Sequence, residues 1–73
     1  MATFEITIYN KEVRENVEAG EHHRRFSDSW ADFQYIEIKA GDENQARAKV
    51  EAMHPGVQGF VIDDVRDISG GFE

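Results

Sequence analysis

The sequence contains no cysteine, a single proline and a single tryptophan, and its apolar runs are short. Without cysteine there can be no disulfide and no thiolate ligand for zinc or an iron–sulfur cluster. The apolar runs are too short to cross a bilayer, and residues 1–5 lack the basic and then apolar pattern of a signal peptide. Because a chain without cysteine suits a reducing compartment, we expect a cytoplasmic location.

Basic side chains are also in the minority, with 8 Lys and Arg against 15 Asp and Glu and a net charge of −7. This charge opposes binding to phosphate backbones and anionic membranes. It is compatible with a partner protein that has a basic surface, although a well-solvated surface is the commoner reason for such a charge. The 73 residues suffice for one small domain. We expect that domain to span residues 1–69, with a flexible tail at 70–73.

Three segments have the patterns of β-strands. Residues 3–9 (TFEITIY) and 33–40 (FQYIEIKA) alternate apolar and polar side chains, as half-buried strands do. If these two strands run antiparallel, Glu5 could pair with Lys39. In residues 57–65 the apolar run is continuous rather than alternating, which predicts either a strand that is covered on both faces or a strand with a β-bulge at Asp63–Asp64.

Residues 42–54 give the clearest helix signal. Asp42 is a good N-cap, and Gln45 completes a capping box three residues later. Pro55-Gly56 then ends the helix. The expected buried stripe consists of Ala46, Val50 and Met53.

The fold class predicted from these elements is α+β. A three- or four-stranded, mostly antiparallel sheet has the main helix (about 42–54) packed on one face. Residues 10–32 supply either a short helix, since Val13 and Val17 are spaced by four, or a hairpin strand within 21–26. If they supply both, the order becomes the β-α-β-β-α-β of ferredoxin-like folds. One helix covers one face, so the face with the aromatic side chains is exposed or is a contact surface; it carries Tyr9, Phe33 and Tyr35.

The most unusual local feature is the cationic segment His22-His23-Arg24-Arg25. The guanidinium groups of Arg24 and Arg25 could bind a phosphate or a carboxylate with two hydrogen bonds each. A solvated loop whose charges are balanced by nearby glutamates is the favoured alternative. Adjacent histidines on a strand point to opposite faces, and no H-x-x-x-H spacing is present, so we expect no metal site and no cofactor.

Two further sets of side chains invite a functional interpretation. Trp30 lies between Asp28 and Asp32 and is either an interface anchor or the residue that closes one end of the core. The acidic residues around Asp63 and Asp67 could hold a divalent cation, but the calcium-loop pattern is absent and a solvated strand end is favoured.

No nucleophile or paired-carboxylate motif rises above chance, so we expect a non-enzymatic protein with no catalytic residues. The leading hypothesis is a protein–protein interaction module, an adaptor or inhibitor of the kind that phages also encode. It would dock on a basic or aromatic-accepting surface through a sheet face or through residues 21–32. One alternative is a small-ligand or nucleic-acid binder that uses residues 22–25. Another is a homo-oligomeric structural subunit. The candidate binding residues are His22, His23, Arg24, Arg25, Trp30 and Tyr35.

Overall fold

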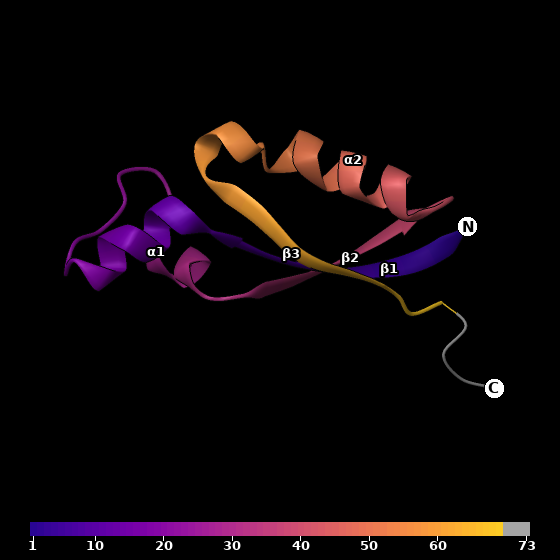
Figure 1. Ribbon diagram of the computed structural model, residues 1–73, viewed down its shortest axis with the longest axis horizontal. Helices are drawn as coiled ribbons and strands as arrows, with labels where there is room; N and C mark the ends of the chain where they lie inside the picture. Colours follow the sequence, from indigo (N-terminus) through magenta and orange to yellow (C-terminus); the bar gives the residue numbers. More distant parts are fainter. Residues whose placement is uncertain (70–73) are drawn as a thin grey trace.

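Three strands form one antiparallel sheet in the order β2-β1-β3, with helices at one end and on one face (Figure 1). The computed structural model describes residues 1–69, and the predicted tail at 70–73 lies outside them. The predicted α+β class is confirmed. The elements are β1 (Ala2–Asn10), α1 (Lys11–Glu18), the 3-10 turn η1 (Asp28–Ala31), β2 (Gln34–Ala40), α2 (Glu43–Met53), the 3-10 turn η2 (Gly56–Gln58) and β3 (Phe60–Asp67).

The central strand β1 pairs with both of its neighbours, so its register fixes the whole sheet. Glu5 lies opposite Glu37 of β2 and Arg66 of β3. The expected pairing of Glu5 with Lys39 is therefore wrong, and Lys39 lies opposite Thr3 instead. A shift of two residues changes partners without changing faces, so alternation alone could not distinguish the two registers.

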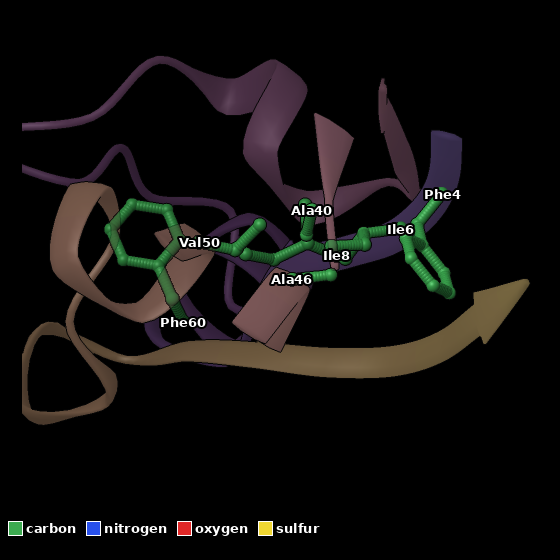
Figure 2. Close-up of a cluster of buried hydrophobic side chains, with 7 residues drawn as sticks. All are labelled: Phe4, Ile6, Ile8, Ala40, Ala46, Val50 and Phe60. Atoms are coloured by element: carbon green, nitrogen blue, oxygen red, sulfur yellow. The ribbon is translucent and has the colours of Figure 1, made fainter. Parts of the chain in front are cut away.

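The helix α2 packs on one face of this sheet and closes the core (Figure 1). Asp42 Oδ1 accepts the Gln45 N–H at 2.9 Å, and Gln45 Oε1 accepts the Gly41 N–H at 2.9 Å. The predicted capping box is thus present, although its second bond reaches the residue before the cap. Figure 2 shows the buried cluster that results: Phe4, Ile6, Ile8, Ala40, Ala46, Val50 and Phe60.

The third position of the predicted helix stripe is wrong, because Met53 is 53% exposed. The helix ends at Met53, and His54 serves as its C-cap. The next residue, His54, is the one that packs against aromatic rings. Trp30 and Phe60 lie within ring contact of His54, with centroid distances of 5.0 and 4.9 Å.

Of the two alternatives for residues 57–65, the β-bulge at Asp63–Asp64 is the one observed. Thr7 pairs with Asp64 and Ile8 pairs with Ile62, so Asp63 is left without a partner on β1. The extra residue changes the alternation along β3. As a result, Ile62 before the bulge and Val65 after it both pack against the core.

The start of α1 is fixed by a buried asparagine. Asn10 is fully buried, and its Oδ1 accepts the N–H groups of Glu12 and Val13 at 2.9 and 3.1 Å. Its Nδ2 donates to the Gln58 carbonyl at 3.0 Å. This one side chain therefore joins the end of β1, the first turn of α1 and the turn that leads into β3.

The short helix expected from Val13 and Val17 is present as α1, but only Val13 is buried, and Val17 is 40% exposed. Residues 19–27 form no strand. Of the three- and four-stranded alternatives, the three-stranded sheet is the one observed, and the ferredoxin-like order does not apply to residues 1–69. Within the same residues, no helix has the length and apolar character needed to cross a membrane.

Candidate functional site

Within residues 1–69, α2 covers one face of the sheet and no helix packs across the opposite face (Figure 1). Directly paired residues share a face of an antiparallel sheet, so the register identifies the side chains on this open face. They are Thr3, Glu5, Thr7 and Tyr9 of β1, Tyr35, Glu37 and Lys39 of β2, and Val61, Asp64 and Arg66 of β3.

Aromatic side chains gather at the end of the open face that is nearest α1. The Tyr9 and Phe33 rings meet edge to face, with centroids 5.6 Å apart and planes at 82°. Phe33 is 43% exposed and Tyr35, which lies opposite Thr7, is 64% exposed. We call Tyr9, Phe33 and Tyr35 the aromatic patch. It combines rings that are fixed by packing with rings that are open to solvent.

Arg14 of α1 holds this patch in place. Its guanidinium carbon lies 3.9 Å from the centroid of the Tyr9 ring and 5.3 Å from that of Phe33. Its Nε donates to the carbonyl of Ala31 at 2.8 Å. The arginine thus fastens α1 to η1 and stacks on the patch through cation–π attraction.

The opposite end of the open face is charged rather than aromatic. Arg66 Nη1 lies 3.8 Å from Glu5 Oε1, while Glu37 and Lys39 are exposed on β2. Such exposed pairs contribute little to stability. The face is therefore divided along its length into an aromatic end and a charged end.

The cationic segment 22–25 lies in the irregular loop between α1 and η1. His23 turns inward: its side chain is 13% exposed, its Nδ1 accepts the Arg25 N–H at 3.1 Å, and its Nε2 lies 3.2 Å from Glu12 Oε1. Arg24 and Arg25 are exposed. The loop therefore separates its four predicted site residues, with His23 against the fold and the arginines in solvent.

His22 forms an exposed pair with Asp28, at 2.8 Å between Nδ1 and Oδ2. The hydrogen bond to Asp28 and the charge of that carboxylate raise the pKa of His22 above its ordinary 6.5. The pair therefore stabilises the folded chain below the ordinary pKa, and its contribution is lost as the pH rises through the raised value.

We predict that Asp28→Asn returns the pKa of His22 toward its ordinary value, because the substitution removes the negative charge. An NMR titration of the histidine ring protons measures this shift. Asp32→Asn is the matched control, since it removes a nearby exposed carboxylate that has no contact with His22. An equal change in the pKa of His22 in both variants would show that Asp28 is not the cause of the raised value.

Trp30 belongs to a group of rings at one end of the core. Its centroid lies 5.0 Å from those of His54 and Phe60, and Phe26 lies 5.0 Å from Phe60. His23 extends the group, 5.1 Å from Phe26. Of the two roles considered for Trp30, this position is that of a residue closing one end of the core.

Residues 1–69 contain no group of three or more histidine or carboxylate side chains that could hold a metal ion, and no pocket.

Both edges of the sheet carry charged side chains. Lys49 Nζ donates to the Lys39 carbonyl on β2 at 2.6 Å, and Asp63 and Asp64 are exposed on β3. Charged side chains at edges discourage strand addition.

The structure does not bring the six predicted binding residues into one site. Tyr35 lies on the open face, Trp30 and His23 lie against the core, and the remaining three are exposed in the loop. Sequence reasoning had no reason to single out Arg14, because its contact with Tyr9 crosses the junction between a strand and a helix. Neither the period of two nor that of 3.6 residues connects those two positions.

No protein-family model, no curated protein and no solved structure matches this chain. What can be said of function therefore comes from the residues and their geometry.

Proposed function

We propose that this chain is a non-enzymatic interaction module that docks on a partner protein through the open face of its sheet. The observation that carries the proposal is the aromatic patch, where Phe33 and Tyr35 are exposed on a face that no helix of residues 1–69 covers. Aromatic residues and arginine are enriched in interfaces and dominate their binding energy. A cytoplasmic site of action belongs to the same proposal.

The patch is arranged before any partner arrives. Arg14 stacks on Tyr9, and Tyr9 packs against the edge of Phe33. Binding through side chains that are already ordered loses less conformational entropy than binding through mobile ones. Two rings of the patch are therefore prepared for docking, and Tyr35 adds a third beside them.

Charge indicates what kind of partner fits this face. The chain carries a net charge of −7, and exposed carboxylates of Asp32, Glu37 and Asp64 lie on the open face or beside the patch. Complementary charge speeds encounter and selects among partners more than it adds affinity. The partner we propose has a basic surface, and its association slows as salt is added.

The double substitution Phe33→Ala and Tyr35→Ala tests the proposal. Tagged protein is used to capture partners from lysate of its source organism with elution by salt, and the captured protein is then titrated against each variant by calorimetry. We expect the double variant to bind at least about tenfold more weakly, since truncation of a hot-spot residue costs ~2 kcal/mol or more. The far-UV circular dichroism should not change, because both side chains are exposed.

The matched control is the double substitution Met53→Ala and Val57→Ala. These apolar side chains are 53% and 92% exposed and belong to α2 and η2, which lie away from the open face. They should leave binding unchanged. A captured protein that binds both double variants equally well, or an eluate that holds no protein, would overturn the proposal. Nucleic acid in the eluate would favour residues 22–25 as the binding site. A mass of the purified protein in solution that is a multiple of the monomer mass would favour self-association.

A further inference from the structure

One face of the Arg14 guanidinium is occupied by the fold, and the rest of its hydrogen-bonding capacity is unused within residues 1–69. The ring of Tyr9 lies against it at 3.9 Å, and Nε donates to Ala31 at 2.8 Å. Neither Nη1 nor Nη2 forms a hydrogen bond or an ion pair with any described residue. A guanidinium has five N–H donors, so four of them remain for a ligand.

We infer that Arg14 is a carboxylate-binding site at the aromatic end of the open face, and that it receives one Asp or Glu side chain of the docking partner. The two Nη groups match the two oxygens of a carboxylate in a bidentate pair. Stacking and the Nε bond already order this side chain, so less entropy is lost when the pair forms.

A carboxylate fits this site better than a phosphate does. The chain carries a net charge of −7, and Asp32 stands exposed next to Phe33 of the patch. A dianionic phosphate would meet about twice the repulsion that a monoanionic carboxylate meets. A partner that is basic over most of its contact surface complements the net negative charge of the chain. One carboxylate on that surface, placed opposite Arg14, would pair with the guanidinium.

The same chain contains an internal comparison. Arg24 is exposed, and within residues 1–69 it has neither a stacked ring nor a carboxylate partner. It has the same chemistry as Arg14 but none of the ordering. Any affinity that Arg14 has beyond that of Arg24 therefore comes from the ordered setting of the guanidinium.

The first experiment needs no partner. Sodium acetate is titrated into isotope-labelled protein at constant ionic strength, with sodium chloride as the balancing salt, and the arginine N–H resonances are followed by NMR. We expect a saturable shift at Arg14, with a half-saturating concentration at least about threefold below that of Arg24, because the Arg14 side chain is already ordered and loses less entropy on binding. Shifts that do not saturate, or that are equal at both arginines, would overturn the inference. A tighter site for inorganic phosphate than for acetate would overturn the carboxylate assignment.

The second experiment uses the partner and rests on the proposed function. Arg14→Lys keeps the charge and removes the bidentate geometry, so it should weaken partner binding about tenfold, because a hydrogen bond to a charged group is lost. Arg24→Lys should leave binding unchanged. If Phe33→Ala with Tyr35→Ala weakens binding but Arg14→Lys does not, the inference fails while the proposed function stands. If no partner is captured, the proposed function fails and the acetate titration decides the inference.

Discussion

Replacing Gly59 with alanine should remove most of the stability of this domain. Gly59 has a φ of +99°, a conformation that L side chains rarely adopt, and a Cβ built there lies 2.7 Å from Asn10 Oδ1 and 2.8 Å from Glu12 Cγ. The left-handed backbone costs about 1–2 kcal/mol, and displacement of the Asn10 cap costs about 0.5–2 kcal/mol more. The core of so small a domain supplies only about 3–5 kcal/mol, so a combined loss of about 1.5–4 kcal/mol should lower the urea concentration at the unfolding midpoint strongly.

Urea denaturation followed by circular dichroism measures this loss. Gly56→Ala is the matched control, because no atom lies within 4 Å of a Cβ at Gly56 and its φ is not positive. That variant should stay within about 0.5 kcal/mol of the wild type, as most surface changes do. Equal stability of the two alanine variants would show that the close approach at Gly59 is relieved by movement of Asn10.

The second large effect is expected from Asn10→Ala. The substitution removes the acceptor for the Glu12 and Val13 N–H groups and the donor to the Gln58 carbonyl. Loss of an N-cap costs about 0.5–2 kcal/mol, and a buried polar group left without a partner costs about 1–3 kcal/mol. We expect a loss of about 2–4 kcal/mol in the free energy of unfolding, again measured in urea.

Asn44→Ala provides the comparison for this variant, since Asn44 is exposed in the first turn of α2. It should change stability by no more than about 0.5 kcal/mol. The double variant Asn10→Ala with Gly59→Ala supplies a further check. Both changes damage the same cap, so their combined cost should be smaller than the sum of the two separate costs. Full additivity would mean that Gly59 acts independently of Asn10.

The parts of the fold that could be predicted are those that depend on residues close together in the sequence. Alternation predicted β1 and β2, the capping residues Asp42 and Gln45 predicted the start of α2, and the continuous apolar run before Asp63 gave the bulge as one of two alternatives. Each of these signals depends on residues a few positions apart, and each expresses a rule that tertiary contacts did not override.

What could not be predicted depends on residues far apart in the chain. Asn10 meets Gln58, Trp30 meets His54, and Arg14 binds the Ala31 carbonyl. No period connects such positions. Met53 was expected to be buried because it continues a helical stripe, but α2 ends at this residue, and His54 after it is the side chain that packs against Trp30 and Phe60. The open face was foreseen as a surface that carries aromatics, whereas the arginine that orders it was not.

The central place of β1 in the sheet has a consequence for how the chain folds. Of the three described strands β1 is made first and β3 last, yet these two are neighbours, and Phe4 pairs with Asp67 across nearly the whole described length. Pairings between distant residues form slowly, because a large loop must close before they contribute any energy. While β3 is still inside the ribosome, β1 has only one neighbour, and the core lacks Phe60. We therefore expect the sheet to be completed only once β3 has left the ribosome, and the charge of the chain to help keep the partly folded segment dispersed until then.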